Sequence, residues 1–524
     1  MELAKRLNIK LAWERTKIDY REQTFVQQAF QRQVTEFHID DWLDSIRESV
    51  RNGSYKPSYC RIADIPKPGG HIRPGGVLVP EDTIVYSALL LDAIEEIKES
   101  LKWSNKENRF SNILLESQTS DRWVETGTQN WVSFKNKAIR EAEICPYTVQ
   151  FDIAAFYENI DIKTISSDLE FIGIEGDTLN LLTVCLFEWT GPRRRGIPQG
   201  FLPSSILSEV YLDTIDLSLK EEGIEFVRYV DDGFIFCSNE LDAIKNMHFL
   251  TRALRDKGLN LQTAKTRILD QEKALDVIRD KSVLVEHAND KIKAKVEEIG
   301  GLSLSYAPPF EIEKFLRKKG ISLRVDELRK LFDSEIILHL ESFNKSLFHY
   351  ILYKMKSFLD DYQFNIFLNL IAIRPEETKH ILNYLKAFKF SHKEEIERRF
   401  VRYLSIDSRL IEYQRYTLVK WILEERFFSK DLVSVVRKNL AVNGISIWYR
   451  DYILAYLGKY GNASDLARIE RIYETESNSY SKAAIICSLR ELPKGRRNEL
   501  YSKAQSKDYI VKLAVEWAKS NKSY

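Results

Sequence analysis

The chain lacks any long apolar run. No stretch approaches the roughly eighteen apolar residues that span a membrane, and the N-terminal "MELAKRLNIKLAW" has no apolar signal core. Cysteine is scarce: five residues, far apart and without a CxxC pair, favour reduced thiols over a disulfide framework or a zinc site. These absences predict a cytoplasmic protein with no membrane partner.

An excess of charge of either sign is also missing. The 78 basic residues are balanced by 77 acidic residues. Any nucleic-acid partner must therefore be held by local basic tracks, because the surface as a whole is not positive. The net charge by itself neither supports nor excludes such a partner.

The apolar content is sufficient for sizeable cores. With 524 residues, 44% of them hydrophobic and 12% aromatic, the chain should fold into two or three domains. Up to about residue 285, Gly/Pro-rich loops, short apolar runs and helical patterns alternate, which predicts a mixed α/β domain.

After about residue 340 the strand signals nearly vanish. Aromatic-led amphipathic helices are predicted at 412–425, 448–461, 479–492 and 507–520. Their starts are 36, 31 and 28 residues apart, in the range of two-helix solenoid repeats. An irregular helical bundle is the alternative. The predicted fold class is therefore α/β followed by all-α.

Two adjacent aspartates, Asp231 and Asp232, interrupt the strand-like "RYVDDGFIF". The pattern predicts two short strands around an Asp-Asp-Gly turn. Neighbouring carboxylates disfavour each other's ionisation, and a divalent cation such as Mg²⁺ is the usual remedy. A solvent-exposed turn is the alternative, because Asp-Gly is common in hairpins.

A third carboxylate, Asp152, ends another apolar strand in "PYTVQFDIAAFYENID". If the strands pair, three carboxylates meet at one sheet end, where they could hold two metal ions roughly 4 Å apart for phosphoryl transfer. Alternatively, Asp152 only caps the turn that follows it. The joint occurrence favours the metal site.

Five segments occur together in one order: "IPKPGGHIRPGGVLVPEDTIV", "FDIAAFYENID", "RRRGIPQGFLPSSILSEVYL", "RYVDDGFIF" and "GLNLQTAKTRIL". Over about residues 60–270 they resemble the fingers and palm motifs of reverse transcriptases. The resemblance implies a fingers-palm domain in 1–285, a thumb-like connection in 286–340, and a HEAT-like α-helical repeat domain with a C-terminal tail in 341–524.

The resemblance also implies roles for residues around the reaction. Asp152, Asp231 and Asp232 would bind two Mg²⁺ ions, and Lys67 and Arg73 would pair with the triphosphate of a dNTP.

Tyr157 would exclude a ribose 2′-hydroxyl, although core packing is the alternative and Phe156 could be confused with it. Lys265 would protonate the pyrophosphate leaving group; a lysine at the start of a strand is the alternative.

Further implied residues would contact template and primer. Gln199 would touch the template strand and the nascent pair, with Gly196 and Gly200 allowing close backbone approach. Arg195, with its two preceding arginines, would follow a phosphate backbone or form a solvated loop. Tyr229 would pack near the primer terminus.

A polymerase domain followed by helical repeats resembles the bacterial defence-associated and abortive-infection reverse transcriptases, and among them the class-nine defence enzymes. This resemblance implies a bacterial cytoplasmic enzyme of antiphage defence, a bound non-coding RNA template, and a trimeric or hexameric homo-oligomer. It also implies protein-primed homopolymer synthesis, with the DNA product covalently attached. Tyr524, at the end of the polar tail "WAKSNKSY", is the candidate primer.

Two other functions stay open at this stage. One is a template-independent, protein-primed DNA polymerase of the abortive-infection type, against which an intact "GIPQG" argues. The other is an inactive polymerase fold that serves as an RNA-binding scaffold. A scaffold has no need for an uncompensated acid cluster, so the three retained aspartates argue against it.

Overall fold

The computed structural model describes residues 2–22, 26–116, 120–125, 127–279, 324–504 and 508–521. It divides into two compact units, which we describe separately. The first comprises Met1–Thr24, Ile46–Ile62 and Gly75–Tyr350, and the second Phe25–Ser45, Ala63–Pro74 and Ile351–Tyr524. The predicted thumb-like sequence at 297–316 and the candidate primer Tyr524 lie outside the described residues.

A four-stranded antiparallel sheet is the centre of the first unit, with the strand order β4-β5-β3-β6. Its strands are β3 (Tyr147–Asp152), β4 (Phe226–Tyr229), β5 (Asp232–Cys237) and β6 (Arg267–Asp270). Alternate residues of β5 face opposite sides of the sheet, as the twofold strand period requires. Phe234 and Phe236 join one core cluster with Phe134 and Ala138 of α7 (Gly127–Ile144).

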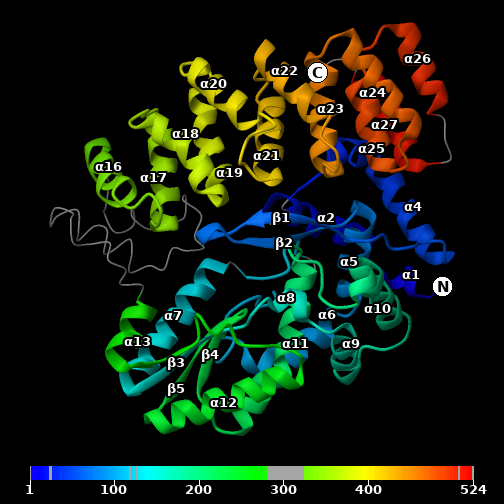
Figure 1. Cartoon of the computed structure of the whole chain (residues 1–524). Helices are drawn as coiled ribbons and strands as arrows, with labels where there is room; N and C mark the ends of the chain where they lie inside the picture. The colour runs from blue at the N-terminus through cyan, green and yellow to red at the C-terminus, as the bar shows by residue number, and fades with distance from the viewer. Residues whose placement is uncertain are drawn as a thin grey trace. The chain divides into compact units, whose positions relative to one another are not determined.

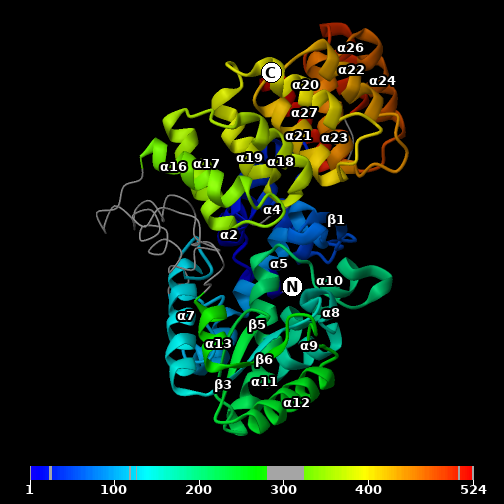
Figure 2. The same ribbon diagram turned by 60° about the vertical axis from the view of Figure 1, so that its left-hand side comes forward.

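Helices cover both faces of this sheet. On the face of the core cluster, α7 is joined by α13 (Gln271–Ile278). Helix α12 (Glu240–Asp256) contacts β3 and β5 and also packs on α11 (Leu202–Glu221). Figure 2 shows the strands between α7 and the pair formed by α11 and α12. The predicted helix, glycine turn and strand over 250–269 correspond to the end of α12, Gly258 with a φ of 72°, and β6.

Several of the remaining helices of the first unit pack on α5 and α10. Helix α5 contacts α2 and α10, and α9 contacts α10 and α11. The bounds are α1 Leu3–Arg6, α2 Ile9–Glu22, α5 Pro80–Asp92, α6 Ile94–Leu101, α8 Phe156–Asn159, α9 Ile162–Phe171, α10 Gly176–Thr190 and α16 Val325–Phe332.

Four of the described elements contain a boundary between the units. The predicted short strands of 62–82 are β1 (Arg61–Pro66) and β2 (Ile72–Val77), which form a two-stranded sheet. The boundaries between the units also fall within α4 (Ile39–Arg51) and α17 (Lys345–Phe358).

The second unit is helical among its described residues, apart from the strand ends it shares. The four helices predicted from their aromatic starts are α21, α23, α25 and α27, and each contacts the next in the series. A single helix lies between successive members, so the two-helix repeat is confirmed (Figure 1). The bounds are α3 Gln31–Thr35, α18 Phe364–Ile373, α19 Thr378–Leu385, α20 Lys393–Tyr403, α21 Glu412–Glu424, α22 Lys430–Asn439, α23 Ile447–Tyr460, α24 Ala463–Thr475, α25 Ser479–Ser488, α26 Lys494–Lys503 and α27 Tyr509–Ser520.

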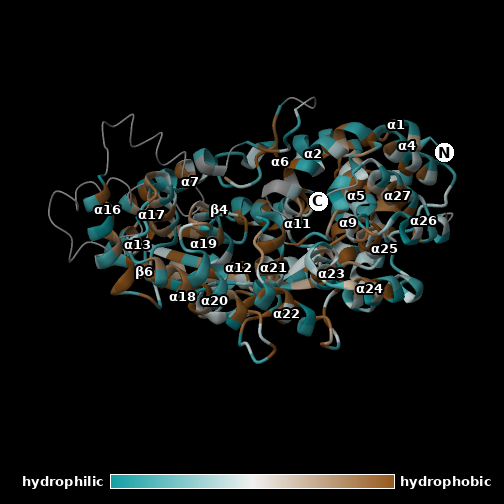
Figure 3. Cartoon of the chain, turned by 90° about the horizontal axis from the view of Figure 1, so that it is seen from above, coloured by the Kyte–Doolittle hydropathy of each residue, from teal (hydrophilic) through white to brown (hydrophobic). Residues whose placement is uncertain are grey.

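Aromatic side chains fill the interior between these repeats. Trp421 and Trp448 are buried, and the Trp421 indole N–H donates to the Leu382 carbonyl at 3.0 Å. Trp517 is half-buried, with its ring centroid 5.6 Å from that of Phe30. The helices of this unit carry both hydrophobic and hydrophilic residues, as amphipathic helices do (Figure 3). Within the described ranges, no helix combines the length and the apolar character that crossing a membrane requires.

Candidate active site

Strand pairing brings the acidic residues to one end of the sheet. In the register of β3 with β5, Asp152 lies directly opposite Asp232. Asp231 precedes Asp232 in the connecting turn, and its carbonyl accepts a hydrogen bond from the Ile153 amide at 3.0 Å. The three carboxylates predicted to meet therefore belong to the end of one antiparallel strand pair.

The hairpin turn is not the Asp-Asp-Gly turn that its sequence predicts. Strand β4 ends at Tyr229 and β5 begins at Asp232, so Val230 and Asp231 form the turn and Gly233 lies inside a strand. A Cβ on Gly233 would meet the Val227 carbonyl oxygen at 2.6 Å and also the Phe151 ring. This glycine is thus required for close strand packing, whereas the local turn pattern indicated a role in chain reversal.

The carboxylates of the acid cluster disfavour one another's ionisation. Burial, followed by the hydrogen bond to Asp152 and the charge of Asp231, raises the pKa of Asp232 to about 8. Lys265 supplies a partial counterion, with its Nζ 2.5 Å from Asp152 Oδ2. Although burial alone lowers the pKa of the Lys265 amine, the neighbouring carboxylates, chiefly Asp152, raise it overall.

This donor set fits a magnesium site. Carboxylate oxygens are the hard ligands that Mg²⁺ prefers, and a cation would relieve the repulsion that raises the pKa of Asp232.

Tyr157 and Phe156 have different environments on the short helix α8. Phe156 is 2% exposed and belongs to the core, whereas Tyr157 is half-buried. The Tyr157 hydroxyl donates to Ser205 Oγ at 3.3 Å. Burial raises the pKa of Tyr157 to about 12, so this phenol stays neutral at physiological pH. Of the two aromatic residues, Tyr157 has the accessible ring.

The loop that contains "GIPQG" is tied to α8 by its backbone. The Gly196 amide donates to the Ile160 carbonyl at 2.8 Å and the Ile197 amide to the Tyr157 carbonyl at 3.0 Å. Gly196 has a φ of 86°, and a Cβ there would lie 3.0 Å from the Glu158 carbonyl oxygen. Glycine therefore allows the loop to approach α8 closely.

The other predicted template residues lie along the same loop. The Gln199 carbonyl accepts from the Gly76 amide at 2.8 Å, and Gly200 has a φ of 107°. Arg195 is exposed, but its guanidinium donates to the carbonyls of Asn159 at 3.0 Å and Gly258 at 2.5 Å. Arg195 thus braces this loop against two others.

Tyr229, next to the turn, packs on α7. Its ring meets Trp131 edge-on with 4.8 Å between centroids, and its hydroxyl lies 3.4 Å from the Gly127 carbonyl. Lys67 is exposed and Arg73 half-buried on the β1–β2 hairpin. Both belong to the second unit, whereas the aspartates belong to the first unit. The structure therefore gives these two cations no defined distance to the acid cluster.

Residues that the sequence analysis did not single out lie directly behind the turn. Arg228 is 2% exposed and pairs with Glu209 at 2.5 Å and Asp216 at 2.6 Å, both on α11. The signal was present in the sequence: three acids, Glu209, Asp213 and Asp216, interrupt an otherwise largely apolar helical stretch, and buried acids need partners.

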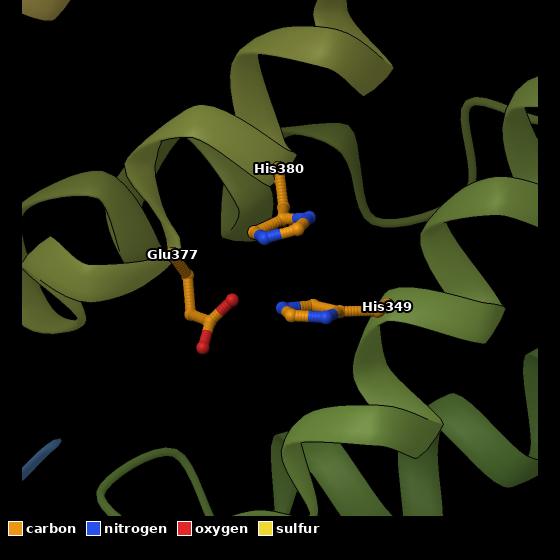
Figure 4. A group of neighbouring side chains, drawn as sticks. All are labelled: His349, Glu377 and His380. Carbon is orange, nitrogen blue, oxygen red and sulfur yellow. The ribbon is translucent and has the colours of Figure 1, made fainter. Parts of the chain in front are cut away.

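In the part of the chain that the structure describes, one group of three histidine or acidic side chains has donor atoms close enough together to hold a metal ion. His349, Glu377 and His380 have donor atoms within 4.8 Å of one another (Figure 4). His349 is assigned to the first unit and the other two residues to the second, so we count this group as a site of neither unit.

A known family model matches part of the chain. Residues 65–279 match the family model described as reverse transcriptase (RNA-dependent DNA polymerase). The matched range contains β3, the β4–β5 hairpin with its aspartates, and β6. This part of the chain is a reverse transcriptase domain. A mostly helical region follows the matched range.

Solved structures resemble this chain only weakly. The apo telomerase of Candida tropicalis truncated from its C-terminal domain is 16% identical, with 43% of this chain and 54% of that chain covered and a TM-score of 0.29. The Candida albicans telomerase in complex with the TWJ fragment of telomeric RNA is 12% identical, with 69% and 67% covered and a TM-score of 0.33. This chain thus spans about half the length of the first of these structures. No curated protein matches it, and we draw no conclusion from likenesses this weak.

Proposed function

We propose that this enzyme copies an RNA template into DNA from dNTPs with two Mg²⁺ ions held by Asp152, Asp231 and Asp232. The observation that carries the proposal is the cross-strand pairing of Asp152 with Asp232 at the end of the sheet, where burial and neighbouring carboxylates raise the pKa of Asp232 and Lys265 contacts Asp152. When bound, the metal ions supply the charge that stabilises the attacking and leaving oxygens.

The protein's own groups have complementary roles. Lys265 holds a proton on its Nζ beside Asp152 and is placed to donate it to the pyrophosphate leaving group. Tyr157 is fixed by Ser205 and by the loop around Gly196, and its ring limits the space beside the sugar. Gln199 and Gly200 support the template and the nascent pair, Arg195 the phosphate backbone, and Tyr229 the primer end. Lys67 and Arg73 bind the triphosphate.

We infer the wider biological role from the order of the parts. A reverse transcriptase domain followed by stacked two-helix repeats supports a defence enzyme of the abortive-infection kind, in which the repeats offer an extended surface to RNA or to other subunits. We include in this proposal antiphage activity in the bacterial cytoplasm, a bound non-coding RNA, a trimer or hexamer, and protein-primed homopolymer synthesis with Tyr524 as the primer. The proposed domains are the fingers and palm in 1–285, a thumb-like connection in 286–340, and the helical repeat domain with its C-terminal tail in 341–524.

A labelling experiment tests this function. The protein is purified with its bound nucleic acid, given Mg²⁺ and each labelled dNTP separately, and the products are compared with and without protease and RNase pretreatment. RNA-templated, protein-primed synthesis predicts a product made from a single dNTP. Protease should alter this product, and RNase pretreatment should abolish it. Incorporation of any dNTP regardless of RNase would instead indicate a template-independent polymerase.

Variants separate catalysis from scaffolding. The Asp231→Ala, Asp232→Ala double variant should lose all incorporation and all phage protection, whereas Asp407→Ala, an exposed aspartate of the second unit, should lose neither. Full phage protection by the double variant would refute a catalytic role and favour an RNA-binding scaffold. Replacing Tyr524 by Phe should abolish the covalent protein–DNA product; a persisting adduct removes Tyr524 as the primer.

A further inference from the structure

The turn that carries the catalytic aspartates has a strained backbone. Val230 joins β4 to β5 with a φ of 57°, in the left-handed region. A β-branched residue rarely adopts this conformation, because its side chain crowds the backbone there. Such strain persists only where the surrounding structure enforces it, and it gathers at functional sites.

Both backbone polar groups of Val230 are held by buried side chains. The Val230 amide donates to Ser111 Oγ at 2.8 Å, and its carbonyl lies 3.3 Å from Arg228 Nη1. Ser111 Oγ in turn donates to Glu209 Oε1 at 2.6 Å, and Glu209 Oε2 accepts from Arg228 Nη1 at 2.5 Å. The contacts close a ring that begins and ends on the backbone of Val230.

Neighbouring residues fix this ring in place. Asp216 accepts from Arg228 Nε at 2.9 Å, and Asn112 Nδ2 donates to Glu209 Oε1 at 2.7 Å. Ser111 and Glu209 are each 1% exposed, so these hydrogen bonds lie away from water, where they are strong and costly to break.

A buried ion pair could exist for structural reasons alone, but the hydroxyl of Ser111 indicates a further role. An Arg228–Glu209 pair needs no neutral bridge to a turn amide. Ser111 connects the carboxylate of Glu209 to the amide of Val230, which has the strained conformation. The network is therefore directed at the turn in addition to neutralising charge.

We propose that Ser111, Glu209 and Arg228 are positioning residues of the polymerase, an inference that rests on the proposed function. They hold Val230 in its left-handed conformation, and this conformation places Asp231 and Asp232 at the end of β3, opposite Asp152. None of the three touches the reacting atoms.

The test combines loss of the hydroxyl with relief of the strain. Ser111→Ala removes the acceptor of the Val230 amide, so the turn should relax and kcat for dNTP incorporation should fall by about tenfold or more. The KM for dNTP should stay within about twofold. Adding Val230→Gly should restore most of kcat, because glycine adopts a positive φ without side-chain crowding. A merely structural defect would not be repaired by removing the valine side chain.

Ser87→Ala is the matched control. Ser87 is another buried serine of the first unit, whose hydroxyl pairs with that of Thr16 at 3.3 Å. Both single variants should lower the midpoint of thermal unfolding, but Ser87→Ala should leave kcat unchanged. The proposal is overturned if Ser111→Ala retains wild-type kcat, or if the Ser111→Ala, Val230→Gly variant is as inactive as Ser111→Ala alone.

A readout without catalysis separates this proposal from the proposed function. Mn²⁺ binding, followed by electron paramagnetic resonance on the full chain, should weaken several-fold in Ser111→Ala and recover in the double variant. If the wild-type protein incorporates no nucleotide but this Mn²⁺ pattern holds, the positioning role stands and the polymerase proposal fails. Unchanged Mn²⁺ affinity in Ser111→Ala overturns the positioning role whatever the activity.

Discussion

Replacing Gly233 tests how tightly the β4–β5 hairpin is packed. It follows Asp232 in β5 and lies opposite Phe151 in β3 and Arg228 in β4. A Cβ added here would lie 2.6 Å from the Val227 carbonyl oxygen. That position is about 0.8 Å inside the shortest ordinary contact distance, and the obstructing atom belongs to backbone, which cannot rotate away. Gly233→Ala must therefore separate β5 from its neighbours.

The size of the effect follows from this overlap. Overpacking of this kind costs about 1–3 kcal/mol, which for a unit of this size lowers the thermal midpoint by roughly 2–10 °C. Because the displaced strand begins with Asp232, we also expect incorporation of dNTPs to fall by up to about 100-fold.

The assay is differential scanning fluorimetry together with single-dNTP incorporation. Gly495→Ala is the control, since Gly495 is exposed in α26 with no atom within 4 Å of the added Cβ. It should change the midpoint by no more than about 1 °C and leave activity unchanged. A Gly233→Ala variant with the midpoint and activity of the Gly495→Ala control would refute the packing argument.

Three other predictions follow from the site and the core. Tyr157→Ala should reduce the preference for dNTPs over NTPs by at least about tenfold, measured as the ratio of kcat/KM, whereas Phe156→Leu, a core change, should lower stability without altering that ratio. Mg²⁺ should raise the thermal midpoint of the wild type but not of the Asp231→Ala, Asp232→Ala variant, because a ligand of the native site stabilises the native state; equal shifts in both proteins would contradict the metal assignment. Asp82 is buried, and burial raises its pKa to about 6 from the usual 3.8, so the folded state binds its proton more tightly than the unfolded state does. Stability should therefore fall by up to about 3 kcal/mol as the pH rises from 4 to 6, and Asp82→Asn should flatten this slope in denaturant titrations; an unchanged slope would show that Asp82 is not its source.

Much of the fold was accessible from local patterns. The strand ending at Asp152, the helix, turn and strand over 250–269, and the two-helix spacing of 412–520 all depend on periodicity and glycine placement, which act over a few residues. The turn at Val230 could not be predicted in the same way. Local chemistry favours Asp-Gly as the turn, and only the long-range pairing of β5 with both β3 and β4 moves Gly233 into a strand.

The residues of the candidate site also differ in whether local sequence patterns could predict them. The acidic residues were found because their number and order are unusual in apolar segments. Ser111 could not be found, since a serine in "RFSNILL" has no local peculiarity and acquires its partners from residues 98 and 119 positions away. Contacts at such separations depend on the assembled fold and leave no periodic trace in one sequence.

Two groups of acids in the first unit differ in their counterions, and the difference supports the proposed metal site. Glu209 and Asp216 face Arg228 at 2.5 and 2.6 Å, so folding itself supplies their counterion. Asp152 and Asp232 face each other at the end of the sheet with Lys265, whose side chain is 64% exposed, as the partial counterion. Placing carboxylates next to one another costs stability, and a ligand that binds after folding would relieve this cost. A divalent cation has the charge and the preference for oxygen that this end of the sheet requires.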